Sequence, residues 1–215
     1  MASDTFSHQR REYGDAPLHE RELPRDPLVL LRDWLAAAEA AGVGEPNGMA
    51  LATCGADGQP HCRIVLMKGL AARGLTFFTN KNSDKGAQLA ANARAAATFW
   101  WQAPRNRQVR VAGRVEATSE AVADAYFASR PRRAQLCSAA SPQSRVVASR
   151  EQLEALVEAF TDKVGEQDVP RPTHWGGYVL VPQSIEFWQG REARLHDRYR
   201  YIEAGGVWAI ERLAP

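Results

Sequence analysis

The stretch MALATCGADGQPHCRIVLMKG, residues 49–69, predicts the beginning of an antiparallel sheet. It consists of two apolar runs on either side of a glycine-containing turn, which is the pattern of a β-hairpin. Further apolar runs predict three strands that follow it along the chain: 75–80, 95–101 and 107–117. We therefore expect the middle of the chain to form mainly antiparallel sheet.

Helical segments lie around these strands. In DPLVLLRDWLAAAEAAG, residues 26–42, Asp26 can cap a helix, Pro27 suits its first position and Gly42 can end it. Capping patterns and alanine-rich composition predict three more helices: 83–94, 119–130 and 149–165. Residues 131–148 are too rich in small and polar side chains to be assigned.

The end of the chain predicts strands again, over residues 176–190, 194–201 and 206–213. A total of about seven or eight strands at hairpin-like spacing, with helices between groups of them, predicts an α+β fold built on an antiparallel β-barrel with peripheral helices. Residues 26–215 would form this single domain. Residues 1–25 are polar, carry both charge signs and lack an apolar period, so we expect a flexible arm there.

The composition is that of a globular enzyme or binding protein rather than a membrane or nucleic-acid protein. Hydrophobic residues make up 45% and charged residues 24% of the 215, and the net charge is only +2. No signal core and no apolar run of the roughly 20 residues that a membrane span needs are present, which predicts a cytoplasmic protein. The three cysteines follow neither a metal-binding nor a disulfide pattern, so we expect free thiols and no metal.

The stretch FWQGREARLHDRYRY, residues 187–201, is unusually cationic. If a strand begins at Arg194, the side chains of residues 194, 196, 198 and 200 share one face, which then carries three arginines, one histidine and no carboxylate. Such a face predicts an anionic ligand.

Other candidate anion-binding groups occur earlier in the chain. They are Arg63 and Lys68 on one strand, Lys85 in a first helical turn, Tyr126 and Arg130 four residues apart, and Gln143 with Ser144 in a loop. Each cation alone could be solvated, and His196 alone could be structural. Together with Trp188, the set suits a phosphorylated heteroaromatic ligand.

Several motifs occur in the order of a known family. They are RIVLMKG (63–69), FFTN (77–80), RQVRVAG (107–113), YFASRPR (126–132), PQS (142–144), HWGGY (174–178) and FWQGREARLHDR (187–198). In these motifs the chain closely resembles the pyridoxine/pyridoxamine 5′-phosphate oxidases, FMN enzymes that make pyridoxal 5′-phosphate. The resemblance runs from RREY at 10–13 to RLAP at 212–215.

The resemblance implies an FMN-binding split barrel that forms a homodimer, with FMN in a cleft between the subunits. The implied FMN contacts are Arg63, Ile64, Val65, Leu66, Met67, Lys68, Phe78, Thr79, Lys85, Gln108, Gln143, Ser144, Trp188 and Arg198. The implied substrate contacts are Arg10, Arg11, Glu12, Tyr13, Lys68, Tyr126, Arg130, Arg194, Leu195 and His196. Of these, Lys68, Tyr126 and Arg130 match the pocket for the substrate phosphate. Arg194 and His196 match the catalytic pair that holds the pyridine ring against the flavin.

The activity implied is oxidation of pyridoxamine 5′-phosphate and pyridoxine 5′-phosphate to pyridoxal 5′-phosphate. A hydride would pass from the substrate to FMN, and O₂ would reoxidise the flavin to give hydrogen peroxide. Little acid–base chemistry is required, so positioning of the substrate should dominate the rate.

Two positions depart from the family pattern. Asp84 stands where the family usually has an arginine for the FMN phosphate, and Ala134 where it often has a serine for the substrate phosphate. Arg132 or Arg133 could compensate for the missing hydroxyl.

Three other functions are considered. The chain could be a related flavin oxidase of secondary metabolism, such as the phenazine-type enzymes, or a protein that binds FMN or pyridoxal phosphate without catalysis. A nucleic-acid-binding barrel using residues 105, 107, 110 and 114 is disfavoured, because these arginines alternate with apolar residues and lack a stacking platform.

Overall fold

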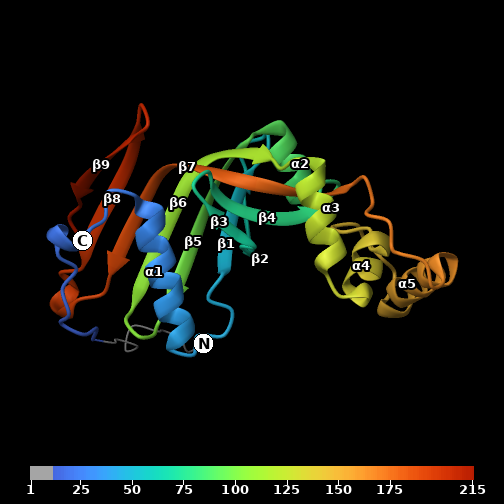
Figure 1. The fold of residues 1–215 in the computed structure, drawn as a ribbon, viewed down its shortest axis with the longest axis horizontal. Coiled ribbons are helices and arrows are strands. Elements are labelled where there is room, and N and C mark those ends of the chain that lie inside the picture. The colour runs from blue at the N-terminus through green and yellow to red at the C-terminus, as the bar shows by residue number, and fades with distance from the viewer. Residues whose placement is uncertain (1–11) are drawn as a thin grey trace, which may run out of the picture. The chain divides into compact units, whose positions relative to one another are not determined.

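A computed structural model describes residues 12–215 of the chain. The helices, labelled in Figure 1, are α1 (Pro27–Ala40), α2 (Asp84–Ala91), α3 (Glu120–Ser129), α4 (Arg132–Ala140) and α5 (Arg150–Val164), with short 3₁₀ turns η1 (Glu20–Glu22) and η2 (Glu192–Arg194). The strands are β1 (Gly48–Cys54), β2 (Pro60–Leu66), β3 (Gly69–Ala71), β4 (Gly74–Asn80), β5 (Arg94–Trp101), β6 (Arg107–Ala117), β7 (Trp175–Gln189), β8 (Asp197–Ala204) and β9 (Val207–Arg212).

The strands form one curled, nine-stranded sheet in the order β2-β1-β5-β6-β7-β4-β3, with β8 pairing with β7 and β9 with β8. The hairpin predicted at residues 49–69 is present as β1 and β2. The pairs β4–β7, β7–β8 and β8–β9 are antiparallel. The predicted α+β fold with an antiparallel sheet is confirmed.

The chain packs as two units. Unit 1 contains the described residues up to Met49 together with Thr98–Val111 and Gln183–Pro215, and unit 2 contains Ala50–Ala97 and Ala112–Pro182. The strands β1, β5, β6 and β7 contribute residues to both units.

In unit 1, helix α1 packs against the end of β7 (Figure 1). The Asp26 carboxylate accepts the backbone N–H of Leu28 at 2.8 Å and Pro27 is the first helical residue, as predicted. The Trp34 ring lies 5.2 Å from the Phe187 ring and nearly perpendicular to it, and both side chains are buried. The helix therefore covers the apolar side of the last residues of β7.

In unit 2, helices α3, α4 and α5 surround a small core of buried side chains: Phe127, Leu136, Val164, Val169 and Trp175. Helix α4 was not predicted. Leu136 is its only buried residue, so the sequence of α4 carries no apolar stripe that would have revealed it.

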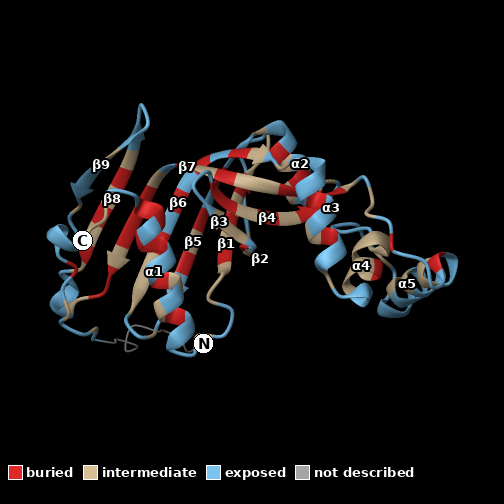
Figure 2. Ribbon diagram, in the orientation of Figure 1, coloured by how far each residue is buried: buried red, intermediate tan, exposed pale blue. Residues whose placement is uncertain are grey.

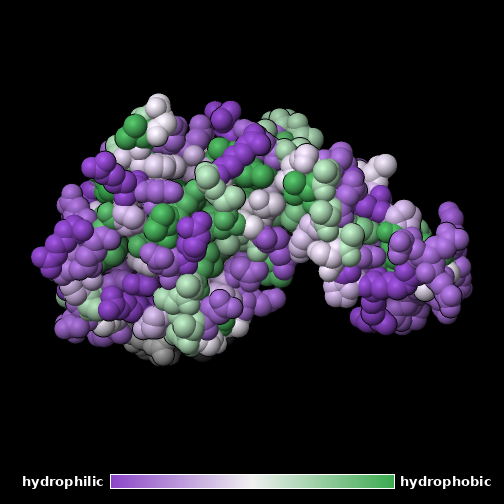
Figure 3. Space-filling model, viewed as in Figure 1, coloured by the Kyte–Doolittle hydropathy of each residue, from purple (hydrophilic) through white to green (hydrophobic). Residues whose placement is uncertain are grey.

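Helix α5 contributes only Val164 to the buried residues, and Figure 2 shows it mostly exposed, with some half-buried residues. Figure 3 shows a mainly hydrophilic surface over the same helix. Among the residues from 12 to 215, no helix is long and apolar enough to cross a lipid bilayer.

The prediction of a strand beginning at Arg194 is wrong. Residues 192–194 form the turn η2, in which Ala193 (φ 50°) and Arg194 (φ 63°) are left-handed, and β8 begins only at Asp197. Left-handed residues cannot continue a pleated strand. Arg194 and His196 therefore do not share a strand face with Arg198.

Candidate cofactor and substrate site

Unit 2 contains a cavity of about 430 Å³ where β2, β4 and the helices α2, α3 and α4 meet. Its lining residues are Arg63, Ile64, Val65, Leu66, Lys68, Phe78, Thr79, Asn80, Lys85, Tyr126, Arg130, Ser138, Ser141, Gln143 and Trp175. Among residues 12–215, four cations line the cavity (Arg63, Lys68, Lys85 and Arg130), and no carboxylate does. We call it the cationic pocket.

The Lys85 ammonium is held by neutral oxygens only. Its Nζ donates to Gln143 Oε1 at 2.9 Å, to Thr79 Oγ1 at 3.1 Å and to Ser83 Oγ at 3.2 Å. Ser83 also caps α2 by accepting the backbone N–H of Gly86. The start of α2 and the lysine are thus fixed by the same hydroxyl.

Arg63, another cation of the pocket lining, also hydrogen-bonds to neutral acceptors. Its guanidinium donates to the Leu51 carbonyl at 3.2 Å, to Thr53 Oγ1 and, at 3.2 Å, to Gln88 Oε1. These bonds orient the guanidinium and leave its charge uncompensated.

The charges of Arg63 and Lys85 act on each other. Burial lowers the pKa of Lys85 below its usual value, the positive charge of Arg63 lowers it further, and Asp84 opposes these effects. Two neighbouring cations without a bound carboxylate favour an anionic ligand between them.

A second part of the cationic pocket is aromatic. The Phe78 ring stacks on the Tyr126 ring at 4.0 Å and on the Trp175 ring at 5.4 Å, and the Arg130 guanidinium lies 5.1 Å from the Trp175 ring centre. Arg130 donates to Ser138 Oγ at 2.8 Å. The predicted pair Tyr126 and Arg130 therefore lines one pocket, although Arg130 caps α3 in extended conformation rather than lying on its face.

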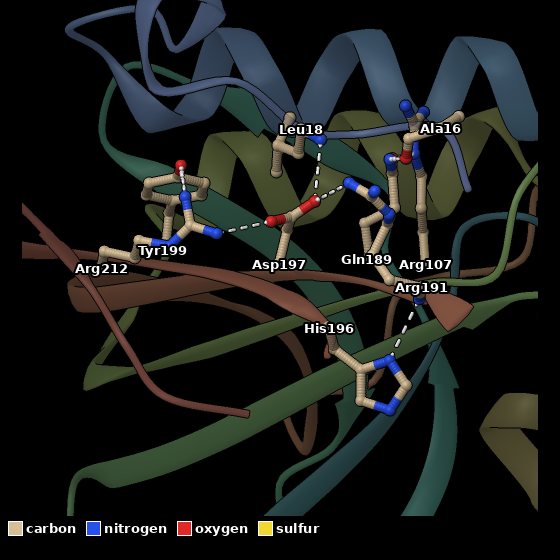
Figure 4. Close-up of polar contacts among 9 residues, drawn as sticks. All are labelled: Ala16, Leu18, Arg107, Gln189, Arg191, His196, Asp197, Tyr199 and Arg212. Carbon is tan, nitrogen blue, oxygen red and sulfur yellow. Dashed lines mark hydrogen bonds and ion pairs between the residues drawn. The ribbon is translucent and has the colours of Figure 1, made fainter. Parts of the chain in front are cut away.

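Other candidate residues of the described chain, among them Tyr13, Trp188 and His196, lie in unit 1. The Trp188 and His196 rings are 4.6 Å apart, and the Tyr13 ring lies 5.6 Å from each of them. His196 Nδ1 accepts the backbone N–H of Arg191 at 3.1 Å, as Figure 4 shows. The proton of neutral His196 is therefore on Nε2, which can donate to a ligand.

Burial and the nearby charge of Arg194 lower the pKa of His196 below its ordinary 6.5. This shift favours the neutral form of its side chain. Arg194 and Leu195 are exposed, and the Arg194 side chain has no ion pair within residues 12–215. Glu12 is exposed and Gln108 is half-buried.

The predicted cationic face without carboxylates is not present on β8. Glu186, on the neighbouring strand, pairs with Arg198 at 2.9 Å and with Arg110 at 3.2 Å. Arg200 pairs with Glu211 at 2.7 Å. The arginines of β8 are thus neutralised by adjacent strands.

Some predicted site residues do not line the cationic pocket. Met67 is buried, and Ser144 accepts the backbone N–H of Asp84 at 3.2 Å. Arg10 and Arg11 lie outside the described residues. Four lining residues were not among the predicted site residues: Asn80 and Trp175, which lie in the motifs FFTN and HWGGY, and Ser138 and Ser141, which lie in the unassigned stretch 131–148.

The two residues that depart from the family pattern, Asp84 and Ala134, are not among the lining residues of the cationic pocket. The Asp84 side chain is exposed and does not line the cationic pocket. Neither Arg132 nor Arg133 lines it either, since Arg132 donates to the carbonyls of Gln167 and Gly165. Instead, Ser138 brings a hydroxyl into the pocket from one helical turn beyond Ala134.

Comparison with known proteins shows the family of this chain. Residues 35–163 match the pyridoxamine 5′-phosphate oxidase family profile, and residues 175–215 match the pyridoxine 5′-phosphate oxidase C-terminal dimerisation region. A pyridoxine/pyridoxamine 5′-phosphate oxidase of Pseudomonas paraeruginosa is 52% identical over 99% of this chain and 100% of its own. One of Cupriavidus pinatubonensis is 51% identical over 96% of this chain and 97% of its own.

Solved structures with the same fold include PhzG from Burkholderia lata, in complex with tetrahydrophenazine-1-carboxylic acid. It is 32% identical, with a TM-score of 0.88 over 94% of this chain and 100% of its own. An FMN-binding, pyridoxamine 5′-phosphate oxidase-related protein of Nostoc punctiforme, 16% identical with a TM-score of 0.69 over 87% of this chain and 96% of its own, shares the fold. The predicted split barrel is confirmed, and the chain belongs to the pyridoxine/pyridoxamine 5′-phosphate oxidase family.

Proposed function

We propose that this protein oxidises pyridoxine 5′-phosphate and pyridoxamine 5′-phosphate to pyridoxal 5′-phosphate, with FMN as cofactor. The observation that carries the proposal is the cationic pocket, in which four cations and no carboxylate face one cavity beside an aromatic stack. A phosphorylated aromatic ligand satisfies both features.

The donor set of the pocket fits FMN. Arg63 and Lys85, with neutral partners only, would hold the FMN phosphate as an ion pair. Ile64, Val65 and Leu66 offer apolar and backbone contacts on the edge of β2 for the rest of the cofactor. Bound FMN would supply a two-electron acceptor that O₂ regenerates with release of hydrogen peroxide.

The phosphate of the substrate would be held by a separate set of side chains. Lys68 and Arg130 supply charge, and the hydroxyls of Tyr126 and Ser138 supply hydrogen bonds. Arg130 is already oriented by its bond to Ser138 and by the Trp175 ring. Binding would therefore require little reorganisation of the pocket.

The residues of unit 1 would place the reacting ring. His196 would donate a hydrogen bond from Nε2–H, and Arg194, whose charge is unpaired within the described chain, would hold the ring in place. We place FMN at the interface of a homodimer, as the match to the dimerisation region supports. Trp188, Gln108 and Arg198 would make further contacts to FMN.

The test uses purified protein reconstituted with FMN and given pyridoxine 5′-phosphate in air. We expect pyridoxal phosphate and hydrogen peroxide in equal amounts, and almost no turnover of pyridoxine, which lacks the phosphate. Bound FMN with no product would contradict the oxidase function.

The fold similarity to PhzG at 32% identity favours one second candidate, oxidation of a reduced phenazine carboxylate. Turnover of a tetrahydrophenazine carboxylate, faster than turnover of pyridoxine 5′-phosphate, would select this alternative. The number of cations in the pocket favours a phosphate dianion over a carboxylate.

A further inference from the structure

An N-terminal segment without helix or strand, residues 12–19, is fixed in unit 1 by side chains rather than by a backbone ladder. The Ala16 carbonyl accepts Gln189 Nε2 at 2.7 Å, and the Leu18 N–H donates to Asp197 Oδ2 at 3.0 Å. Arg107 fixes the Gln189 amide by donating to its oxygen at 2.9 Å. The Leu18 side chain is buried.

Asp197 is the centre of this arrangement (Figure 4). Its carboxylate is only 4% exposed and accepts from three segments of the chain: Leu18 N–H, Arg191 Nη1 at 3.0 Å and Arg212 Nη2 at 2.8 Å. Three donors compensate the desolvation of a buried carboxylate. One side chain thus joins the N-terminal segment, the turn after β7 and the end of β9.

The same carboxylate is directly connected to the ring-binding residues. Asp197 follows His196 in sequence, and Arg191, which Asp197 holds through its guanidinium, donates its backbone N–H to His196 Nδ1. At the other end of the segment, Tyr13 packs edge-on against Trp188 and at an angle against His196.

The contact of Tyr13 with this turn depends on a glycine. A Cβ at Gly190 would lie 2.7 Å from Tyr13 Cγ and 3.0 Å from Tyr13 Cβ, closer than real contacts allow. The absence of a side chain at 190 therefore admits the Tyr13 ring.

We propose that Asp197 is a positioning residue, which fixes the segment at Leu18 so that Tyr13 covers His196 and Trp188, and which orients His196 through Arg191. This role rests on the proposed function and deepens it. It assigns the closing of the ring site to a buried carboxylate that does not itself contact the ligands. Without Asp197, the hydrogen bond from Gln189 to the Ala16 carbonyl would still hold the segment. Further along the chain, the Pro24 carbonyl accepts from the Tyr201 hydroxyl.

The first test needs neither FMN nor substrate, so it is independent of the oxidase function. Hydrogen exchange of the Leu18 amide should be slow in the wild-type protein and faster by about tenfold or more in Asp197→Asn. Glu211→Gln is the matched control, because Glu211 is an exposed carboxylate on β9 whose partner is Arg200. It should leave the exchange unchanged.

A Leu18 amide that exchanges freely in the wild-type protein would overturn the proposal, even if Asp197→Asn does not fold. Equal, slow exchange in wild type and Asp197→Asn would overturn it as well.

The second test is kinetic. Asp197→Asn should raise KM for the phosphorylated substrate about fivefold while kcat changes less than about twofold. Gly190→Ala leaves the Asp197 bonds in place and displaces Tyr13, so it should raise KM similarly with Leu18 exchange unchanged. Unchanged KM in both variants would overturn the proposal, whereas an inactive wild-type protein would reject only the proposed function.

Discussion

The cationic pocket of unit 2 and strand β8 of unit 1 treat positive charge in opposite ways. In unit 2, the cations of the pocket bind neutral oxygens, as Lys85 does with Thr79 and Gln143. In unit 1, the arginines of β8 pair with carboxylates, as Arg198 does with Glu186. Since a paired cation has little left to offer an anion, we expect the phosphate sites in the less arginine-rich stretch of sequence. The local density of arginine is therefore a poor guide to anion binding.

The largest effect expected from this comparison is at Arg130. Arg130→Ala removes a charged, oriented donor of the pocket, so kcat/KM for pyridoxine 5′-phosphate should fall about 100-fold, mainly through KM. Arg132→Ala is the control, because Arg132 bonds to carbonyls outside the pocket. Steady-state kinetics of both variants decides the matter, and a loss below about threefold in Arg130→Ala would place the substrate phosphate elsewhere.

Lys85 should have the next largest effect, on FMN rather than on substrate. Lys85→Ala should weaken FMN binding about 30-fold at pH 7, measured by quenching of flavin fluorescence. Burial and Arg63 lower the pKa of Lys85, so this amine deprotonates below the ordinary 10.5. We expect FMN to bind the charged form, so its affinity should fall as pH rises through the lowered pKa.

Lys85→Arg keeps its charge over the same range and should give a much flatter profile up to pH 10. Equal pH profiles in wild type and Lys85→Arg would assign the titration to another group.

A smaller effect is expected at Ser138, which the structure brings into the pocket beside Arg130. Ser138→Ala should lower kcat/KM for the phosphorylated substrate about fivefold, which corresponds to the roughly 1 kcal/mol that one ordinary hydrogen bond contributes. Turnover of pyridoxine should not change. If it falls equally, the hydroxyl supports the fold and not the phosphate.

The smallest effect is expected at Asp84. Its carboxylate is exposed and outside the pocket lining, so Asp84→Asn should tighten FMN binding only about twofold at low salt. Titrations at two ionic strengths should show the gain disappearing at high salt. A tenfold gain that persists in salt would mean that the carboxylate faces the phosphate.

Local signals in the sequence were reliable for the fold. The caps Asp26, Ser83 and Ser149 each accept a backbone N–H at the start of the helix that they predicted, since capping involves only near neighbours. The hairpin of β1 and β2 was likewise visible from alternating runs and one turn. Helix α4 was not visible, because its one buried residue gives no period.

The partners of the arginines could not be predicted, because they depend on strand register. Arg200 lies opposite Glu186 on β7 and opposite Glu211 on β9. These carboxylates are eleven or more residues from Arg200 in sequence. They become its neighbours only because β7, β8 and β9 pair in this register. The left-handed residues at 193 and 194 were also hidden, since neither is a glycine.

The hydroxyl oxygen of Ser83 shows how one atom can restrict the substitutions that a position accepts. Its buried hydroxyl accepts from the α2 backbone at Gly86 and from Lys85, and donates to the Asn80 carbonyl at 2.7 Å. Aspartate caps helices as well as serine does, and a designer who optimised α2 for stability alone would accept it. In this place, however, aspartate would supply the counter-ion that the pocket lacks, so a cap of equal quality would be a loss of affinity for the cofactor.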